Sequence, residues 1–244
     1  MNFDPNRTVR DFATETPNAT RIFEKLGIDY CCGGGKSLRE ACAQARIPLD
    51  DVLRALEQGG PATQASSAPD FSQAKLAELV DHIVTRHHAY VEQEIPRIQQ
   101  LAKKVLAVHG AHHPELARIQ IAFQALSAEL TSHMMKEEHV LFPYIAELEG
   151  AVTQGRELHT PPFGTVNNPV HMMEMEHESA GALLREIRAA SAEYTAPPEA
   201  CFSYKTLYSA LKDFESDLHQ HIHLENNILF PRAIELERQT ANAV

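Results

Sequence analysis

The chain carries the same 17-residue pattern twice, and this duplication constrains its fold more than any other feature. Residues 133–149 read HMMKEEHVLFPYIAELE, and residues 221–237 read HIHLENNILFPRAIELE. Eight aligned positions are identical at a constant offset of 88 residues: a His, a Glu four residues later, then Leu-Phe-Pro and Glu-Leu-Glu. Because a helix brings residues four apart onto one face, each copy predicts a helix that presents His and Glu together. Two such helices can supply a dinuclear metal site inside a helical bundle.

Each His-x-x-x-Glu helix follows a predicted helix that has a histidine at a matching distance. His88 stands 45 residues before His133, and His177 stands 44 residues before His221. The duplication therefore predicts two copies of one helical hairpin, related by approximate two-fold symmetry, with four imidazoles and two carboxylates at one level of the core. The six candidate metal ligands are His88, His133, Glu137, His177, His221 and Glu225.

These residue types suit a pair of cations. A carboxylate can bridge two metals, so Glu137 and Glu225 are the predicted bridges, and two imidazoles would bind each metal. Glutamate is almost never fully buried without a partner, so two inward-facing glutamates require cations. A set of nitrogen and oxygen donors without thiolate favours iron or manganese, and zinc stays open.

One His-x-x-x-Glu alone is weak evidence, because it is usually a solvated pair on a helix surface. The metal prediction depends on two copies that share the same apolar surroundings and the same spacing to a preceding histidine. His87 competes with His88 for the first ligand position. We choose His88 because it continues an apolar stripe formed by Ala77, Val84 and Val91.

Two aspartates precede predicted ligand positions and are candidates for orienting the imidazoles. They are Asp81 and Asp217. Carboxylates often accept a hydrogen bond from the ring nitrogen that does not bind the metal. We nevertheless expect both residues on exposed helix faces.

The composition limits the partners and the compartment. Residues 58–244 carry 14 Lys and Arg against 24 Asp and Glu, which argues against nucleic-acid or anionic-membrane partners. The four cysteines include an adjacent pair, which is not a disulfide framework and favours a reducing compartment. The first residues are polar, unlike a signal peptide, and no stretch approaches the roughly 20 apolar residues of a membrane span. We therefore expect a cytoplasmic protein without nucleic-acid or membrane partners.

The chain divides into two predicted domains. Gly, Pro, Ser and Ala enrich residues 58–69, which we interpret as a flexible linker. A small N-terminal helical domain over residues 1–57 precedes it, and a large domain over residues 70–244 follows it.

Three short helices are predicted in the small domain. Thr16 is the predicted N-cap of the first, and Gly27 closes it. Ser37 and the glutamate three residues later form a capping box for the second. The third starts at Asp50 or Asp51. Three successive glycines follow two cysteines between the first two helices, and they predict a turn with backbone conformations that other residues avoid.

Four long helices are predicted in the large domain, because apolar residues recur at helical spacing and no stretch alternates with period two. Their predicted ranges are 72–108, 114–148, 169–192 and 202–238. Short connections between the first and second and between the third and fourth favour antiparallel neighbours. The predicted fold class is therefore all-α: an up-down-up-down four-helix bundle with a small N-terminal helical domain.

The motifs of both domains resemble a known family. Residues 29–34 read DYCCGG, residues 133–138 read HMMKEE, and Leu-Phe-Pro occurs in both copies of the repeat. The large domain resembles a hemerythrin-like bundle. In combination with the Cys-Cys-Gly segment, the whole chain is similar to the RIC family (repair of iron centres, the YtfE/ScdA/NorA type). The small domain would then be the ScdA-type domain of that family.

The resemblance implies a specific function. Members hold a non-haem di-iron centre with four histidines and two bridging glutamates, at positions that match the six candidate ligands above. They act in the cytoplasm under nitric oxide or oxidative stress. The implied partners are damaged cluster proteins or iron–sulfur apoproteins, which regain their clusters when iron is supplied from a labile centre. Nitric oxide or O₂ would be the small ligands, and an oxo bridge between the irons stays open.

The adjacent cysteines, Cys31 and Cys32, have two interpretations. They can serve redox or iron-transfer chemistry, as thiolates at a Gly-rich turn that pass iron to an acceptor. They can also be small side chains buried in a tight turn. The family resemblance favours the functional interpretation.

Four functions are compatible with the predicted ligands. The first is a repair protein that donates iron, and the second is an enzyme that reduces nitric oxide or a peroxide. The third is a module that binds nitric oxide or O₂, and the fourth is a bundle with purely structural metal. The first three need the same ligands, so sequence alone does not separate them or decide whether the protein is an enzyme. A monomer and a homodimer are equally compatible with the sequence.

Overall fold

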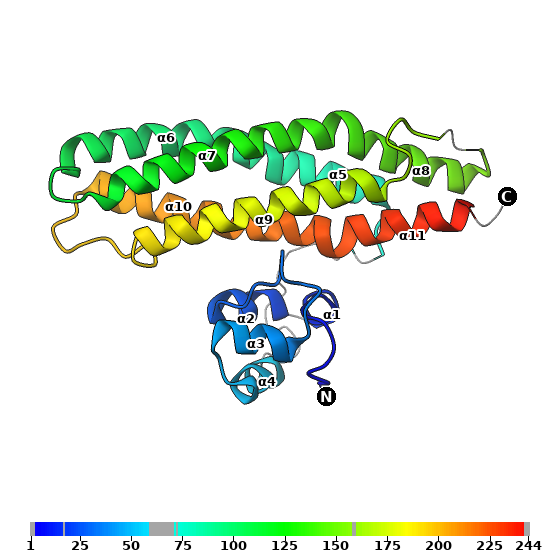
Figure 1. Ribbon diagram of the computed structural model, residues 1–244, viewed down its shortest axis with the longest axis horizontal. Coiled ribbons are helices and arrows are strands. Elements are labelled where there is room, and N and C mark those ends of the chain that lie inside the picture. Colours follow the sequence, from blue (N-terminus) through cyan, green and yellow to red (C-terminus); the bar gives the residue numbers. More distant parts are fainter. Residues whose placement is uncertain (1–2, 17, 59–70, 72, 158–159, 242–244) are drawn as a thin grey trace.

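The structure is a computed structural model, and it describes residues 3–16, 18–58, 71, 73–157 and 160–241. A long helical bundle lies above a small helical unit, which packs against the middle of one side of the bundle (Figure 1). Within the described ranges, the regular structure is helical except for an isolated antiparallel bridge between Thr8 and Ser37. The prediction of an all-α fold is confirmed. Except for Gln58, the predicted linker lies outside the described residues.

The small unit has four helices around a core of its own. They are α1 (Val9–Glu15), α2 (Ala19–Leu26), α3 (Leu38–Ala45) and α4 (Leu49–Gln58). Phe12, Phe23, Leu38 and Val52 are buried together at its centre. Helix α1 was not predicted, although Thr8 and Asp11 form a capping box at its start.

The presence of α1 explains why the predicted cap at Thr16 is wrong. The backbone N–H of Thr16 donates to the Phe12 carbonyl, so Thr16 ends α1 instead of starting α2. Helix α2 begins at Ala19, after Asn18 in a left-handed conformation with φ of 62°. Gly27 closes α2 with φ of 68°, as predicted.

The other two helix starts in the small unit are close to the predictions. Ser37 caps α3, and its side chain exchanges hydrogen bonds with Glu40 in the predicted capping box. Helix α4 begins at Leu49, one residue before the predicted start, because Pro48 already accepts the first helical hydrogen bonds. Asp50 and Asp51 therefore lie in the first turn, where negative charge is favourable.

The bundle consists of four antiparallel rods that match the four predicted long helices. The first is α5 (Leu76–His82), η1 (Ile83–His88) and α6 (Ala89–His109); the second is α7 (Glu115–Lys136), η2 (Glu137–Leu141) and α8 (Phe142–Gln154); the third is α9 (Asn167–Ala190); the fourth is α10 (Phe202–Leu224), η3 (Glu225–Leu229) and α11 (Phe230–Ala241). No helix in the described part of the chain is both long and apolar enough to span a bilayer.

Three of the four rods contain a short π-helical segment, which was not predicted. Segments η2 and η3 end just before Phe142-Pro143 and Phe230-Pro231. Proline has no N–H, so the carbonyl four residues earlier loses its α-helical donor, which favours an irregular turn there.

A π-turn adds one residue and shifts the buried face of the helix. In the first rod, Leu76 and Leu79 are buried ahead of η1 and Ile83 is buried at its first position, whereas Ala77 is exposed. The prediction that the apolar stripe through Ala77 faces the core is therefore wrong before η1. It is correct for His88 and the residues that follow it.

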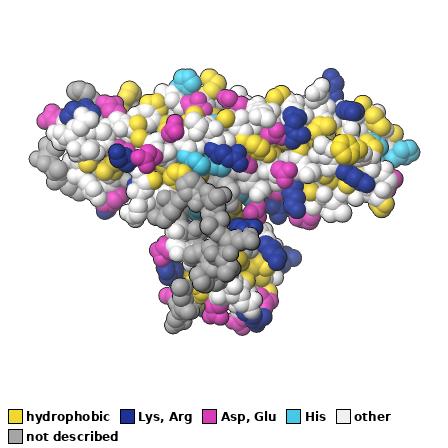
Figure 2. Space-filling view, turned by 180° about the vertical axis from the view of Figure 1, so that it is seen from behind, with side chains coloured by type: hydrophobic (Ala, Val, Ile, Leu, Met, Phe, Trp, Pro, Cys, Tyr) yellow, Lys and Arg dark blue, Asp and Glu magenta, His cyan; other side chains and the backbone are white. Residues whose placement is uncertain are grey.

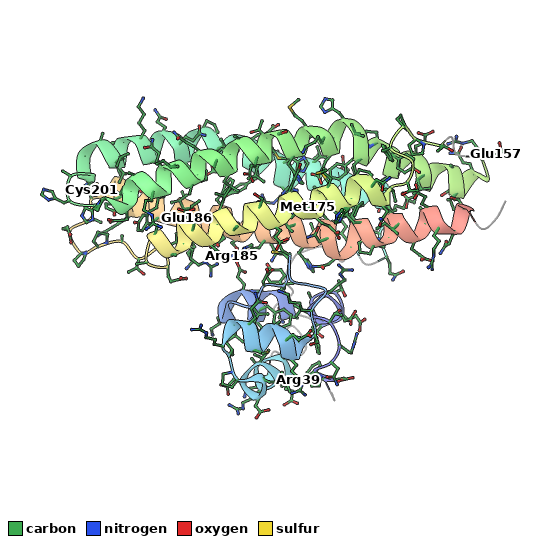
Figure 3. The ribbon with its side chains drawn as sticks, viewed as in Figure 1. Arg39, Glu157, Met175, Arg185, Glu186 and Cys201 are labelled. Atoms are coloured by element: carbon green, nitrogen blue, oxygen red, sulfur yellow. The ribbon has the colours of Figure 1, made fainter. Side chains whose placement is uncertain are left out.

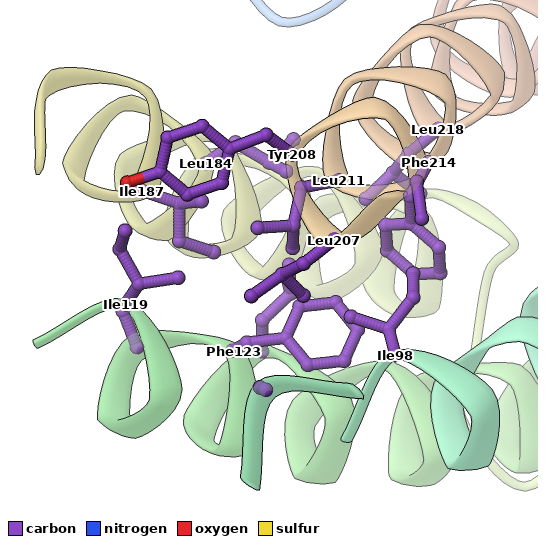
Figure 4. Packing of buried hydrophobic residues seen from close by; sticks show 14 of the residues in the cluster. Ile98, Ile119, Phe123, Leu184, Ile187, Leu207, Tyr208, Leu211, Phe214 and Leu218 are labelled. Carbon is purple, nitrogen blue, oxygen red and sulfur yellow. The ribbon is translucent and has the colours of Figure 1, made fainter. Parts of the chain in front are cut away.

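A polar layer separates two apolar cores along the bundle. One core contains Phe123 of α7, which packs with Leu211 and Phe214 of α10 (Figure 4). The other contains Leu79, Ile145 and Leu229. The candidate ligands lie between them, so the layer has apolar packing on both sides.

Candidate metal centre

The structure brings all six candidate ligands together in the polar layer. They come from all four rods, and none is more than 3% exposed: His88 from η1, His133 from α7, Glu137 from the start of η2, His177 from α9, His221 from α10 and Glu225 from the start of η3. The π-helical segments thus coincide with the centre, as such segments often do at functional sites.

The six side chains form two groups that share both glutamates. His88 and His221 face Glu137 and Glu225 on one side, and the donor atoms of this group lie within 4.8 Å of one another. His133 forms the equivalent group on the other side, with the same two glutamates and His177. We call these the His88/His221 half and the His133/His177 half. The arrangement offers two adjacent cation positions, each with two imidazoles and two shared carboxylates.

Each carboxylate faces both halves. Oε2 of Glu137 lies 3.4 Å from Nε2 of His88 and 3.3 Å from Nε2 of His133. Glu225 divides its two oxygens between the halves. Its Oε1 lies 2.9 Å from Nε2 of His221, and its Oε2 lies 3.2 Å from Nε2 of His177. Both glutamates are therefore placed to bridge two cations.

Hydrogen bonds orient three of the four imidazoles. Nδ1 of His88 lies 2.6 Å from a Glu138 oxygen, and Nδ1 of His133 lies 2.9 Å from a Glu176 oxygen. Nδ1 of His177 lies 2.8 Å from Oδ1 of Asn226. Because carboxylates and amide oxygens only accept, these partners assign the proton to Nδ1 and leave a lone pair on Nε2. That is the tautomer that binds a metal through Nε2.

The unpartnered atoms at the centre fit a pair of cations. Nε2 of His133 lies 3.0 Å from Nε2 of His177, so two lone pairs face each other. Within the described residues, both oxygens of Glu137 and Oε2 of Glu225 are buried without a hydrogen-bond partner. Buried charge of this kind is costly unless a cation compensates it. A metal between the imidazoles and the carboxylates would satisfy all of these atoms.

The pKa shifts of the buried residues also indicate that positive charge is favourable at this site. Burial lowers the pKa of His133, but the adjacent Glu137 carboxylate outweighs this effect and raises the pKa to about 9. Burial would raise the pKa of Glu225, but His221 and His177 hold it well below its usual value. A proton on an imidazole can supply the missing charge, and a metal ion can supply it instead.

The two copies of the repeat pack around the centre in the same way. The phenylalanine of each Leu-Phe-Pro stacks against the histidine of a neighbouring rod: Phe142 against His88 and Phe230 against His177, with ring centroids 5.7 and 6.1 Å apart. The Leu-Phe-Pro motifs therefore contribute packing around the candidate ligands. Each phenylalanine also shields one face of a candidate ligand.

The symmetry fails at His221. Its Nδ1 is buried and has no hydrogen-bond partner among the described residues. His87 stacks on the His221 ring with the centroids 5.6 Å apart, and its own Nδ1 lies 3.1 Å from Asp217. The expectation that Asp217 is exposed is wrong, because this residue is half-buried and contacts His87, a neighbour of the candidate ligands. Asp81 is exposed as predicted.

The Cys-Cys turn of the small unit abuts this centre. Nδ2 of Asn226, whose Oδ1 contacts His177, donates to the Cys31 carbonyl over 3.2 Å. The Cys32 thiol lies 3.5 Å from the His177 carbonyl. Cys31 is buried and Cys32 half-buried, and both are free thiols. Contact with Cys32, together with burial, raises the pKa of Cys31 well above its usual value.

The glycines after the cysteines serve close approach, not an unusual backbone. None of the three has a positive φ, so the predicted reason for them is wrong. A Cβ on Gly34 would lie 2.5 Å from Oδ1 of Asn227, and one on Gly33 would lie 2.9 Å from the Asp29 carbonyl. The small unit can approach η3 because Gly34 has no side chain, and the turn itself can close because Gly33 has none.

Sequence reasoning missed the residues that orient the imidazoles, which are Glu138, Glu176 and Asn226. A usable signal exists, because Glu138 and Asn226 occupy the same position in the two copies of the repeat, directly after the shared glutamate. Glu176 directly precedes His177. Their inward direction depends on the π-turns and on neighbouring rods, which helical periodicity does not encode.

Family models match both parts of the chain, and several known proteins are similar to most of its length. Residues 79–233 match the family model of the hemerythrin HHE cation binding domain, and residues 5–59 match ScdA_N, a domain of unknown function. A protein of Haemophilus influenzae named "Probable iron-sulfur cluster repair protein" is 36% identical over 92% of this chain and 95% of its own length. Proteins of Escherichia coli and Citrobacter koseri named "Iron-sulfur cluster repair protein YtfE" are 36% identical over 92% of this chain and 94% of their own. The chain therefore belongs to the RIC family, in which an ScdA_N domain precedes a hemerythrin HHE cation-binding domain.

Proposed function

We propose that this protein holds two iron ions between the six buried side chains and supplies iron for the repair of damaged iron–sulfur clusters. The observation that carries the proposal is the pair of four-residue groups that share Glu137 and Glu225. The names of the relatives support the repair function, and the cation-binding family supports metal at this site.

The donor set supports iron. Four imidazole nitrogens and two carboxylates without thiolate suit iron or manganese, and imidazole with carboxylate at open coordination positions is typical of non-haem iron. The proposed ligands of the His88/His221 half are His88, His221 and the two shared glutamates, and those of the other half are His133, His177 and the same glutamates. Four protein donors at each position leave further positions for exchange.

The same donor set supports donation to cluster proteins. Iron–sulfur clusters are held by cysteine thiolates, which are softer ligands than imidazole and carboxylate. Ferrous iron that leaves the polar layer would therefore be retained by a cluster apoprotein with free thiolates. In this proposal the iron is the cargo of the protein. Iron held by these six side chains would also be able to bind nitric oxide or O₂.

The experiment that tests the proposal follows the iron. The iron-loaded protein is mixed anaerobically with the apoprotein of a [4Fe–4S] dehydratase, sulfide and a thiol, and both recovered dehydratase activity and iron remaining on the chain are measured. The proposal expects recovery together with loss of iron from the chain. Glu225→Ala should neither hold iron nor support recovery.

A matched control is Glu147→Ala, which changes an exposed glutamate of the same repeat. It should behave like the unaltered protein. Catalytic removal of nitric oxide with full retention of iron, and no recovery of the dehydratase, would contradict donation and favour the enzymatic alternative.

A further inference from the structure

The Cys-Cys turn gathers three donor atoms outside the di-iron ligand set. They are one carboxylate oxygen of Asp29 and the two sulfurs of Cys31 and Cys32, and they lie within 4.8 Å of one another. The Cys31 sulfur is 3.4 Å from Oδ1 of Asp29 and 3.7 Å from the Cys32 sulfur. Backbone N–H groups of both cysteines also donate to Oδ1 of Asp29, over 3.2 and 2.9 Å, which fixes the carboxylate beside the thiols.

These separations are those of ligands around one tetrahedral ion. Two thiolates at about 2.3 Å from a common ion are about 3.8 Å apart, and a thiolate and a carboxylate oxygen at about 2.0 Å are about 3.5 Å apart. The observed sulfur–sulfur and sulfur–oxygen distances are 3.7 and 3.4 Å. We propose that Asp29, Cys31 and Cys32 form a second cation site that suits a thiophilic divalent metal, Fe²⁺ among them.

The fourth position of this site would face open space. Two cavities, of about 680 and 220 Å³, adjoin the turn, and Asp29, Cys31 and Cys32 line both. Helix α9 forms the opposite wall and contributes Met175 and Arg185, and Arg185 lies on the side of α9 that faces the small unit (Figure 3). Asp29 is exposed, so a thiolate from another protein can complete the coordination.

The second site lies next to the His133/His177 half of the proposed di-iron centre. The Cys32 sulfur touches the His177 carbonyl, and Asn226 joins the Cys31 carbonyl to the His177 ring. The site is therefore placed to receive an iron that leaves this half, and this role rests on the proposed function. The transfer moves Fe²⁺ without a change of oxidation state. As the two thiolates bind it, their two protons pass to water.

The surroundings of the turn carry both signs of charge. Glu174 and Glu178 line the larger cavity together with Arg10, Lys36 and Arg185. The acidic side chains can attract a cation, whereas the basic ones can bind a carboxylate of an acceptor protein. Figure 2 shows the small unit beneath the bundle, and acidic and basic side chains are interspersed over the visible face of the molecule.

The test uses Co²⁺, because thiolate ligands give Co²⁺ charge-transfer absorption that imidazole and carboxylate ligands do not. The full-length, iron-loaded Cys201→Ser protein is titrated anaerobically with Co²⁺, since Cys201 contacts His109 at the far end of the bundle and would otherwise add a thiol signal. One equivalent of thiolate-bound Co²⁺ is expected, with the iron content unchanged.

Two further variants in this background identify the ligands. Adding Cys32→Ser should abolish the absorption, whereas adding Cys42→Ser, which removes a thiol from the core of the small unit, should leave it intact. Iron content and helicity verify that each variant is folded. Absorption that is absent, or that persists in the Cys32→Ser variant, would overturn the second site.

The outcome also separates this inference from the proposed function. A chain without iron in the bundle that still gives the Cys32-dependent absorption would retain the second site and refute the di-iron proposal. A chain that holds iron and repairs clusters but gives no such absorption would refute the second site alone.

Discussion

The Nδ1 atom of His177 donates a hydrogen bond to Oδ1 of Asn226 over 2.8 Å, and Nδ2 of Asn226 donates to the Cys31 carbonyl. In the first copy of the repeat, Glu138 takes the place of Asn226 and accepts from Nδ1 of His88 over 2.6 Å. A carboxylate makes an imidazole a stronger metal donor than a neutral amide does. Asn226, in place of a glutamate, therefore makes His177 a weaker metal donor and connects its ring by hydrogen bonds to the small unit.

Asn226→Ala should lower the affinity of the His133/His177 half for iron. Loss of a hydrogen-bond partner of this kind typically reduces metal affinity about 10–100-fold. Release of ferrous iron to a coloured chelator would be faster than in the unaltered protein. His139→Ala is the control, because His139 lies at the next position of the first copy and is exposed. Equal release rates for Asn226→Ala and the unaltered protein would argue against the role of Asn226.

Gly34→Ala should disturb the docking of the small unit on η3. The new methyl would lie 2.5 Å from Oδ1 of Asn227. This oxygen accepts a hydrogen bond from Arg10, and Nδ2 of the same amide donates to the Tyr30 carbonyl. Overpacking of this kind costs about 1–3 kcal/mol. Gly35→Ala is the matched control, because a Cβ there meets no atom within 4 Å. Thermal unfolding should show a lower Tm for Gly34→Ala alone, and an unchanged Tm would contradict the tight contact.

The metal-free protein should lose stability as the pH rises. The pKa of His133 is about 9 in the folded protein, above its ordinary value near 6.5. The protonated ring therefore stabilises the fold fully below about pH 6.5, and this contribution disappears as the pH passes about 9. Denaturant unfolding at pH 7 and pH 9.5 measures the effect. Iron-loaded protein should lack this decline, because a metal replaces the proton, and an equal decline would be evidence against metal at His133.

The apolar core around Phe214 should contribute strongly to the stability of the bundle. Phe214 is 1% exposed and contacts Phe123 at a centroid distance of 5.4 Å, whereas Phe202, on the same helix α10, is 85% exposed. Phe214→Ala should reduce the free energy of unfolding by about 3–5 kcal/mol. Phe202→Ala should change it by less than about 0.5 kcal/mol. Chemical denaturation of both variants checks the difference, and similar losses would refute the packing described here.

The duplicated motif made much of the fold predictable. Its helical spacing and its recurrence after matching histidines placed His88, His133, Glu137, His177, His221 and Glu225 in one layer, and the structure brings these six side chains together. The reason is that an i,i+4 pair on an apolar stripe fixes both the helix face and the direction of burial.

What sequence could not supply depends on contacts between distant segments. The π-turns shift the helix face by one residue, so Ala77 left the core and Glu138 and Asn226 turned inward. Helix α1 has only seven residues and was not predicted. The glycines of the Cys-Cys turn were predicted to adopt backbone conformations that other residues avoid. Gly34 is needed instead because Asn227, almost two hundred positions further along the chain, occupies the space of a side chain there.

Iron analysis of the anaerobically purified protein beside Glu137→Ala and Glu225→Ala tests the central claim most directly. Each glutamate faces both halves of the centre, so loss of either one should remove both cations and not one. The account predicts about two irons per chain in the unaltered protein and in the Glu147→Ala control, with nearly none in either bridging variant. A folded chain that holds no iron, or variants that each retain one firmly bound iron, would contradict the shared-carboxylate centre.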